Sequence, residues 1–342
     1  MIFFRSDYSQ GAHPKILEAL TRTNLENSDG YGLDVHCDNA RQMVKDLIGR
    51  QDAHVHLMVG GTPTNITTIA ASLRPYEAVV APRSAHIYIH ETGGVEATGH
   101  RIIAMPPEDG KLTPELIEKA WLEYEDEHTV IPKMVYISNT TEDGTIYKKS
   151  ELEALSKCCK DHNMYLYMDG ARLGAALTCE DNDLSIKDIA NLVDAFYIGG
   201  TKNGALFGEA LVILNDEINN HFRWMIKQNC GLLAKGRLLG VQFEELLRDG
   251  EKGIYFQMAA HSNKMSKMLR DGITAAGYSF KGSSHTNQIF PIFPTEMVRE
   301  LEKDFFFYDW EGWDDNHRVI RLVTSWGTTE EDVKAFLKAL NK

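Results

Sequence analysis

Apolar positions recur every three or four residues in several stretches of the chain, and this period predicts amphipathic helices. The predicted helices cover residues 14–20, 38–47, 66–73, 114–124, 149–163 and 262–276. Short apolar runs between them predict strands. The predicted strands cover residues 53–59, 78–80, 101–104, 133–137, 164–168 and 195–198. Short strands that alternate with helices indicate an α/β fold, in which helices cover both faces of a mainly parallel sheet.

The pattern changes after about residue 240. A helix-rich stretch is followed by strand-like runs at residues 286–293 and 319–323 and by a helical pattern at residues 329–340. We therefore predict two domains. The large α/β domain covers residues 1–240, with the N-terminal segment included, and a small α+β domain covers residues 241–342.

Charge and composition narrow the classes of function. The net charge of −13 at pH 7 argues against a general binder of nucleic acid or of anionic membranes. No apolar run is long enough to span a bilayer, and the apolar start of the chain is too short for a signal peptide. The five cysteines are scattered without a Cys-x-x-Cys pair, so neither a disulfide framework nor a zinc site is indicated. We predict a cytoplasmic protein with no metal ion and no nucleic-acid or membrane partner.

Two of the predicted strands end in residues that can do chemistry. One strand runs into Gly199-Gly200-Thr201-Lys202, and another ends in Asp169-Gly170-Ala171-Arg172. In parallel sheets, ligands bind outside the carboxyl ends of the strands. A lysine and a carboxylate at such ends suit pyridoxal phosphate (PLP), because the amine holds the aldehyde as a Schiff base and the carboxylate keeps the pyridine nitrogen protonated. The sequence therefore predicts a PLP site with Lys202 and Asp169 as catalytic, cofactor-binding residues.

A third strand end resembles a phosphate cradle. Gly60-Gly61-Thr62 lies between the strand at 53–59 and a predicted helix. Exposed amides and the helix dipole favour an anion at such a position. The segment has no Walker lysine and no GxGxxG pattern, so it favours neither a nucleoside triphosphate nor a dinucleotide. The alternative is an ordinary strand-to-helix turn capped by Thr62 or Thr64.

Further candidates lie near the same strand ends. His86 follows the strand at 78–80, and an aromatic ring stacked on PLP contributes about 1 kcal/mol. Glu91 is a candidate to orient this ring. Arg172 and Arg321 suit bidentate recognition of a carboxylate or phosphate. The alternatives are a loop histidine without a ligand, a solvated glutamate, a surface arginine at a strand edge, and a helix cap at Asp169.

Together these residues resemble the threonine aldolases, of the β-eliminating lyase group of PLP enzymes with the aspartate aminotransferase fold. The resemblance covers most of the chain. It rests on Ser6-Asp7, Tyr31-Gly32, Gly61-Thr62-x-x-Asn65, Ala85-His86, Glu91-x-Gly93-Gly94, Asp169-Gly170-Ala171-Arg172, Thr201-Lys202 and Arg321. The Asp-Gly-Ala-Arg motif followed by the lysine at this spacing is the specific part, and the N-terminal pieces are weak by themselves.

The resemblance implies how the cofactor is held. Lys202 would carry PLP, Asp169 would pair with the pyridine nitrogen, and His86 would stack on the ring as a further catalytic residue. Gly61 and Thr62 would hold the phosphate. The Asp-Gly-Ala-Arg motif also places its arginine among the predicted cofactor-binding residues.

The resemblance also implies a substrate site and an assembly. Ser6, Arg172 and Arg321 would bind the α-carboxylate of an amino-acid substrate. Members are usually homotetramers built from dimers, and Tyr31 would be a substrate contact given to a neighbouring subunit. We therefore expect a homodimer or homotetramer.

Three departures from the family pattern are present. Many of these aldolases carry Glu-Asn-Thr-His where this chain has Ser138-Asn139-Thr140-Thr141, so the family histidine is replaced by a threonine. The family loop Gly-Gly-Gly-Met-Arg reads Asn229-Cys230-Gly231-Leu232-Leu233 here, with Lys235 as the nearby cation. The lysine segment Thr201-Lys202-Asn203-Gly204 differs from the usual Ser-Lys-Gly.

The expected reaction is the retro-aldol cleavage of a β-hydroxy-α-amino acid, threonine or allo-threonine, to glycine and an aldehyde. A base must remove the β-hydroxyl proton, and His86 or a water is the candidate, with Glu142 a more distant one. A PLP-dependent β-eliminating lyase or another amino-acid lyase is the alternative. A non-catalytic protein that binds PLP or an amino acid is a remoter alternative.

Overall fold

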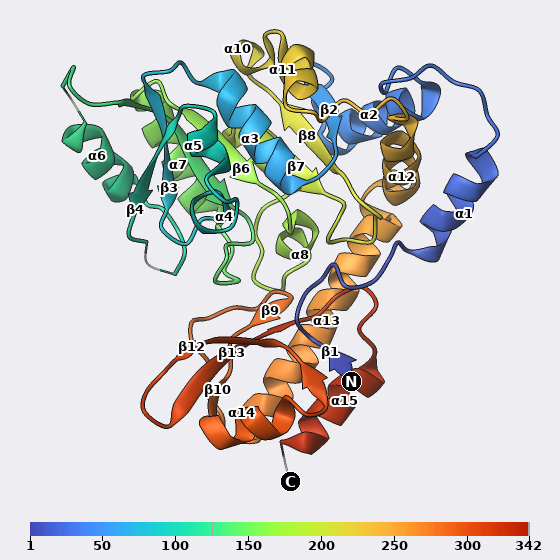
Figure 1. Cartoon of the computed structure of the whole chain (residues 1–342), viewed down its shortest axis with the longest axis vertical. Coiled ribbons are helices and arrows are strands. Elements are labelled where there is room, and N and C mark those ends of the chain that lie inside the picture. The colour runs from blue at the N-terminus through green and yellow to red at the C-terminus, as the bar shows by residue number, and fades with distance from the viewer. Residues whose placement is uncertain (108, 125, 341–342) are drawn as a thin grey trace.

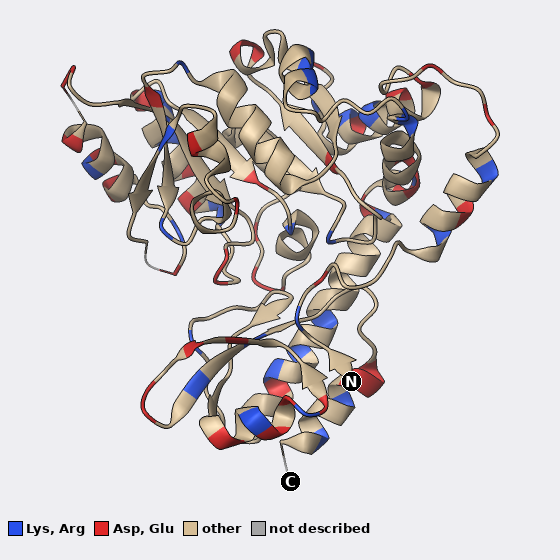
Figure 2. Ribbon diagram, viewed as in Figure 1, with Lys and Arg blue, Asp and Glu red and all other residues tan. Residues whose placement is uncertain are grey.

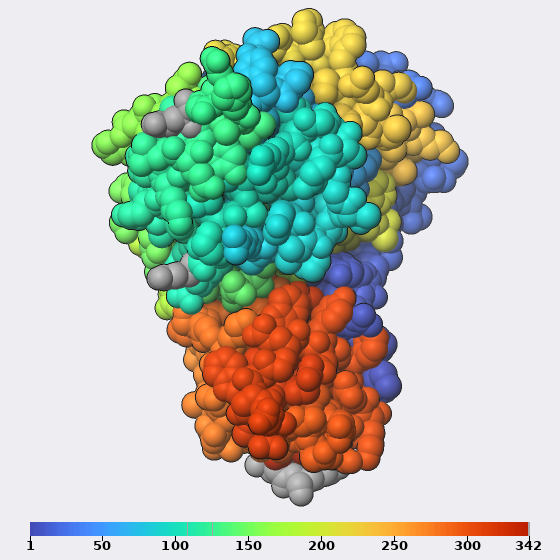
Figure 3. Space-filling model, turned by 60° about the vertical axis from the view of Figure 1, so that its left-hand side comes forward, coloured from blue at the N-terminus to red at the C-terminus, as the bar shows by residue number. Residues whose placement is uncertain are grey.

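The computed structural model describes residues 1–107, 109–124 and 126–340, which form a large upper lobe and a smaller lower lobe (Figures 1 and 3). Both lobes contain strands. These are β1 (Ile2–Phe3), β2 (His54–Met58), β3 (Glu77–Pro82), β4 (Arg101–Met105), β5 (Ile131–Ser138), β6 (Tyr165–Asp169), β7 (Ala195–Gly199), β8 (Glu209–Ile213), β9 (Gln288–Ile289), β10 (Ile292–Pro294), β11 (Phe305–Phe306), β12 (Tyr308–Gly312) and β13 (His317–Val323).

Helices separate most of these strands. They are α1 (Pro14–Thr23), α2 (Val35–Ile48), α3 (Gly61–Ser72), α4 (His86–Ile89), α5 (Gly94–Ala97), α6 (Pro114–Glu123), α7 (Lys149–Asp161), α8 (Leu173–Leu177), α9 (Ile186–Leu192), α10 (Asp216–Asn219), α11 (Phe222–Gln228), α12 (Arg237–Leu247), α13 (Ile254–Ala275), α14 (Thr295–Leu301) and α15 (Glu330–Ala339), with a 3-10 turn at Gly250–Lys252. Within the described residues, no helix has the length and apolarity to cross a bilayer.

A mostly parallel sheet organises the large lobe. Its described strands follow the order β2-β8-β7-β6-β5-β3-β4. Strand β8 is antiparallel to both of its neighbours, whereas the pairs from β7 to β4 are parallel. The predicted strands all occur, with ends that shift by one or two residues, but the prediction lacks β8. The α/β fold class is confirmed.

Alternation along the strands gives the sheet two buried faces. Val135 and Ile137 of β5 belong to one apolar cluster, and Met134 and Tyr136 belong to another. The first cluster is covered by helices such as α2, α7 and α12, and the second by α3 and α11. Charged residues lie mainly on the helices and loops (Figure 2). The sheet is therefore buried on both sides, as expected for parallel strands.

The small lobe has its own sheet and its own core. Strand β13 pairs with β12, β10 and β9, and helices α13, α14 and α15 supply apolar side chains to this core. Helix α13 runs along both lobes (Figure 1): Tyr255 packs in the large-lobe core, and Leu269 packs in the small-lobe core.

The N-terminal segment also belongs to both lobes. Strand β1 pairs with β11, and Phe4 packs in the core of the small lobe, whereas α1 packs against α12 in the large lobe. The division of the chain at residues 240 and 241 stays a prediction. The two cores show that the chain crosses between the lobes after Phe4 and again within α13.

Candidate active site

A cavity of about 690 Å³ lies at the carboxyl ends of the parallel strands, and the small lobe contributes to its wall. Of the residues predicted for the site, seven line it: Gly61, Thr62, His86, Asp169, Arg172, Lys202 and Arg321. The other lining residues are Tyr8, Val59, Gly60, Asn65, His90, Ser138, Thr140, Glu142, Ala171, Tyr197, Thr201, Phe207, Glu209, Gln288, Tyr308 and Trp310.

Asp169 ends β6 and accepts four hydrogen bonds. Its Oδ2 accepts from Tyr136 Oη at 2.7 Å and from Asn65 Nδ2 at 3.0 Å, and its Oδ1 accepts from Tyr197 Oη at 2.6 Å and from the Ala171 amide at 2.9 Å. Burial alone would raise the pKa of Asp169, but these hydrogen bonds hold the pKa below its usual range. The carboxylate is therefore a negative charge that the protein keeps ionised in a buried position.

A chain of polar contacts joins Asp169 to His86. Asn65 Nδ2 donates both to Asp169 and to Glu91 Oε1, the latter at 2.9 Å. The same Glu91 oxygen lies 2.7 Å from His86 Nδ1. Tyr167 Oη donates to Asn65 Oδ1 at 2.8 Å, which fixes the orientation of the amide. Glu91 therefore positions the His86 ring at the cavity wall.

The start of α3 leaves backbone donors free for an anion. Gly60 precedes the helix and makes no side-chain cap. The first helical amides have no partner within a helix, and Pro63 carries no N–H, so Gly61 and Thr62 supply these donors. A Cβ at Gly61 would lie 3.1 Å from Tyr197 Oη, a hydroxyl that binds Asp169. Glycine therefore gives the phosphate cradle and the carboxylate network room to lie side by side.

Lys202 lies in the turn after β7, at the same end of the sheet. Burial, followed by the positive charge of Arg172, lowers the pKa of Lys202 from its usual value. Glu209, the first residue of β8, lies close by, and its Oε2 accepts from the Gly200 amide at 2.8 Å. A lysine with a lowered pKa carries a larger fraction of neutral, nucleophilic amine at neutral pH.

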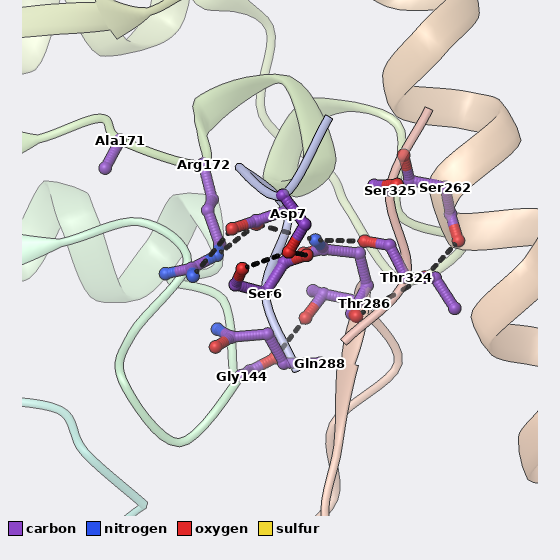
Figure 4. A network of polar contacts seen from close by, with 12 residues as sticks. Ser6, Asp7, Gly144, Ala171, Arg172, Ser262, Thr286, Gln288, Thr324 and Ser325 are labelled. Carbon is purple, nitrogen blue, oxygen red and sulfur yellow. Dashed lines mark hydrogen bonds and ion pairs between the residues drawn. The ribbon is translucent and has the colours of Figure 1, made fainter. Parts of the chain in front are cut away.

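Arg172 is held by a buried carboxylate from the N-terminal segment. Its Nε and Nη2 donate to Asp7 at 2.7 and 3.1 Å, and Figure 4 shows the two side chains pointing toward each other. Asn287 Nδ2 donates to Asp7 Oδ2 at 3.0 Å. Burial alone would raise the pKa of Asp7, but the charges of Arg172 and Lys202 hold the pKa below its usual value.

Arg321, on β13, brings a second cation to the cavity. Its guanidinium carbon lies 4.7 Å from the ring centroids of Tyr308 and Trp310. Its Nε is buried and has no hydrogen-bond partner among the described residues. Burial, together with the charge of Arg172, lowers the pKa of Arg321 to about 10. Arg172 thus has a carboxylate partner in Asp7, whereas Arg321 has no ion-pair partner among the described residues, and the site is set up for a second anion.

Comparison with known proteins places the chain in a family. A family model described as β-eliminating lyase matches residues 4–295. The chain belongs to the β-eliminating lyase family. The low specificity L-threonine aldolase of Pseudomonas aeruginosa is 30% identical over 338 residues, which cover 97% of this chain and 94% of that protein. The structure of the threonine aldolase of Leishmania major is 48% identical, with a TM-score of 0.98 over 100% of this chain and 99% of that one.

The structural comparison also confirms the fold class. An aspartate aminotransferase of Thermus thermophilus matches with a TM-score of 0.71 at 15% identity, over 99% of this chain and 90% of that one. This match shows the aspartate aminotransferase fold. Enzymes of the β-eliminating lyase family and of this fold depend on PLP, which confirms the predicted cofactor.

The cavity suits PLP on its own chemistry. The free amides at the start of α3 suit the phosphate, the ionised Asp169 suits a protonated pyridine nitrogen, and the Lys202 amine suits the aldehyde. His86, held by Glu91, offers an aromatic ring at the wall. Residues of this family site that the sequence reasoning missed are Tyr136 and Tyr197, whose hydroxyls bind Asp169, and Asp7, which pairs with Arg172. Buried strand tyrosines need a polar partner, and that rule is the signal that points to the first two.

Two predicted substrate-binding residues do not line the cavity. Ser6 lies beside Asp7 (Figure 4), and its Oγ is 2.8 Å from Ser9 Oγ. Tyr31 is 43% exposed, and Lys227 Nζ lies 4.8 Å from the centroid of its ring. Within one chain, the described residues therefore do not bring Tyr31 to the β-eliminating lyase site, and its contribution to a neighbouring subunit stays a prediction.

The sequence predicts no metal ion. The described residues contain one cluster of possible ligand side chains, and it lies outside the cavity. Glu118 of α6 and Cys158 and His162 of α7 place their ligand atoms within 4.8 Å of one another. His162 Nε2 lies 2.7 Å from Glu118 Oε1, which is a hydrogen-bonded pair in its own right. The described cysteines are all free thiols.

Proposed function

We propose that the protein cleaves a β-hydroxy-α-amino acid, threonine or allo-threonine, to glycine and an aldehyde. The observation that carries this proposal is a single cavity that holds Lys202, the ionised Asp169 and the two arginines Arg172 and Arg321. The relatives from Pseudomonas aeruginosa and Leishmania major, named as threonine aldolases and similar over nearly the whole chain, support the choice of reaction.

The large lobe supplies the groups that act on the cofactor side. When bound, PLP supplies an aldehyde that an amine can condense with and a ring that accepts electrons from a bond at Cα. The lowered pKa of Lys202 increases the fraction of its amine that is neutral and nucleophilic. Asp169 holds a fixed negative charge, and the free amides of Gly61 and Thr62 would hold the phosphate. His86 presents its ring, with Nδ1 fixed by Glu91.

Arg172 and Arg321 supply the grip on the substrate carboxylate. The unpartnered Nε of Arg321 gives this second anion a donor that the protein itself leaves free. A carboxylate held by two cations cannot rotate freely about Cα, so the clamp selects which of the bonds at Cα is broken. A base must then take the proton from the β-hydroxyl as the Cα–Cβ bond breaks.

The test is an assay of the purified holoenzyme with L-threonine, L-allo-threonine and L-serine. We expect equal amounts of glycine and acetaldehyde from the threonines. Release of ammonia and a keto acid instead would favour the β-eliminating lyase reaction. Lys202→Ala is expected to lose both the visible absorbance band of the bound cofactor and the activity, and retention of that band would contradict the role of Lys202.

We also propose that the active form is a homodimer or homotetramer in the cytoplasm. Tyr31, Leu33, Val35 and Trp224 are exposed apolar residues, between 43% and 72% accessible. Free thiols in all described cysteines suit a reducing compartment. Light scattering with size-exclusion chromatography tests the assembly, and a monomeric active enzyme would contradict it.

A further inference from the structure

The loop after β5 brings a carboxylate into the cavity that no step above uses. Thr141 of this loop is buried and faces away: its Oγ1 lies 2.7 Å from Thr145 Oγ1 and accepts from the Thr145 amide at 3.1 Å. Glu142, the next residue, lines the cavity together with Ser138 and Thr140. The loop thus turns its carboxylate toward the site and its neighbouring hydroxyl into the protein.

We propose that Glu142 is the base that removes the β-hydroxyl proton of the substrate. This inference rests on the proposed retro-aldol function and assigns the one proton transfer that the function leaves open. In the step, the carboxylate takes the hydroxyl proton, and the oxygen forms the carbonyl of the aldehyde as the Cα–Cβ bond breaks. Bound PLP would accept the electron pair of that bond. The proton remains on Glu142 until it returns to solvent or to the product.

The side chain is fixed in a way that leaves one oxygen available. Glu142 Oε1 accepts from the His86 amide at 3.0 Å and from Ser138 Oγ at 2.9 Å. Its Oε2 takes part in neither bond. The side chain is only partly buried, so it reaches the space of the cavity. This arrangement suits a base, because the bonds to Oε1 position the carboxylate while Oε2 can face the substrate.

The loop that carries Glu142 is tied to the small lobe on its C-terminal side, at Gly144. Gly144 adopts a positive φ of 75°, and a Cβ there would lie 2.4 Å from Ser284 Oγ. Ser284 Oγ and Thr286 Oγ1 both donate to the Gly144 carbonyl oxygen at 2.9 Å. These contacts tie the loop to the small lobe, so the position of Glu142 is set by both lobes.

The charges that face Glu142 suit a base that works near neutral pH. Burial, followed by the negative charge of Asp169 on β6, raises the pKa of Glu142 to about 7. Hydrogen bonds from its own backbone amide, from Ser138 and from the His86 amide lower the pKa in part. The other groups that face it are the cation Arg172 and the phenols of Tyr136 and Tyr147. A general base is most efficient when its pKa lies near the working pH.

The other carboxylates of the described cavity wall are less suited. Asp169 is 5% exposed, and both of its oxygens already accept two hydrogen bonds. Glu209 is 3% exposed and is bound to the Gly200 amide on the Lys202 side of the cavity. His86 is held at Nδ1 by Glu91, and its ring is the one predicted to stack on the cofactor, so it already has another role in the site. Glu142 alone among the described carboxylates of the wall combines a held oxygen with an accessible side chain.

The experiment compares Glu142→Gln with the wild-type holoenzyme and with Asp143→Asn as a matched control. Asp143 is the adjacent carboxylate and does not line the cavity. Cleavage of L-threonine by E142Q is expected to fall by about 100- to 10,000-fold, the usual contribution of a general base. NMR also measures the rate at which the α-protons of glycine exchange with D₂O. This reaction involves no β-hydroxyl, so its rate in E142Q is expected to stay within about twofold of the wild-type rate.

A second readout does not depend on activity. Infrared spectra of the cofactor-free wild type and of E142Q are recorded and subtracted. The difference is expected to show the carboxylic-acid band of Glu142, which disappears as the pH rises through about 7. In the wild-type enzyme, kcat/KM, which reports the pKa values of the free enzyme, is expected to fall as the pH drops below about 7, because the base becomes protonated. D143N is expected to keep this acid limb.

The outcomes separate the two proposals. If wild type releases no glycine and aldehyde from threonine, the proposed function fails. If wild type cleaves threonine and E142Q cleaves it at a similar rate, the base assignment alone fails. Equal loss of glycine exchange and cleavage in E142Q would also overturn the assignment, because it indicates a damaged site. Should E142Q not fold, Glu142→Asp takes its place: it is expected to retain glycine exchange and to lose cleavage, and unchanged cleavage would overturn the assignment.

Discussion

The two sides of the cavity differ in how completely the protein satisfies its own charges. On the cofactor side, the Asp169 carboxylate accepts four hydrogen bonds from the protein. On the substrate side, Arg321 is partly buried and its Nε has no partner among the described residues. A buried polar group without a partner costs free energy, so its survival in a fold commonly marks a place for a ligand.

The origins of the two sides differ as well. Tyr136, Asp169 and Tyr197 come from β5, β6 and β7, which are neighbours in one sheet, so a single rigid element sets their geometry. Asp7 and Arg321 come from the N-terminal segment and from β13 of the small lobe. The cofactor side is therefore preorganised, whereas the substrate side depends on how the two lobes fit together.

Among substitutions that test this difference between the two sides, the largest effect is expected at Asp7. Asp7→Asn removes the buried carboxylate that pairs with Arg172, and breaking such a buried pair costs roughly 3–5 kcal/mol of stability. The folded-state pKa of Asp7 is lowered, so the contribution of the pair is fully present above the ordinary aspartate pKa and is lost as the pH falls through the lower folded value. Urea unfolding from acid to neutral pH measures this: the wild type and the variant should converge at the acid end. A constant difference at every pH would contradict the pairing.

The next largest effect is expected at Arg321. Arg321→Leu removes a charge-assisted hydrogen bond to the substrate carboxylate, worth about 1.5–3 kcal/mol, so kcat/KM should fall by about 10- to 150-fold. Arg321→Lys keeps the charge but not the planar guanidinium, so its kcat/KM should lie between those of Arg321→Leu and the wild type. Steady-state kinetics measures the loss, and the cofactor absorbance should not change. A loss of cofactor binding would contradict the assignment of Arg321 to the substrate side of the cavity.

The smallest effect is expected on the satisfied side. Tyr197→Phe removes one of the four hydrogen bonds to Asp169, which is worth about 1 kcal/mol, or about fivefold in cofactor affinity. Its loss should raise the pKa of Asp169 without affecting KM for the amino acid. Fluorescence titration of the apoenzyme with PLP measures the affinity. Tyr165→Phe is the control, since Tyr165 lies on the same strand as Asp169 but its hydroxyl donates to Glu217, outside this network. A loss of cofactor affinity as large as the loss of kcat/KM in Arg321→Leu would contradict this expectation. It would show that the other three hydrogen bonds cannot hold Asp169 in place.

Part of this arrangement could be predicted from the sequence, because periodicity and strand ends are local signals. The strand predicted at residues 164–168 is β6 (Tyr165–Asp169), and Lys202 and Asp169 do meet in one cavity as their strand ends indicated. Sequence could not show that β8 inserts between β2 and β7, because strand order depends on long-range pairing. For the same reason, it could not show that Asp7 pairs with Arg172, which lies 165 residues further along the chain. The inward turn of Glu142 beside the buried Thr141 depends on the loop backbone, which no pattern of residue types specifies.

The pairing of β1 with β11 has a consequence for when the enzyme can become active. The partner of Ile2–Phe3 is Phe305–Phe306, which leaves the ribosome about 300 residues later. At usual rates of translation, this interval is roughly 15 to 60 s. The segment that carries Asp7 has no strand partner during that time, and Arg172 emerges long before Arg321 completes the grip. The nascent chain thus passes most of its synthesis with the sheet of the large lobe available and the substrate clamp unformed.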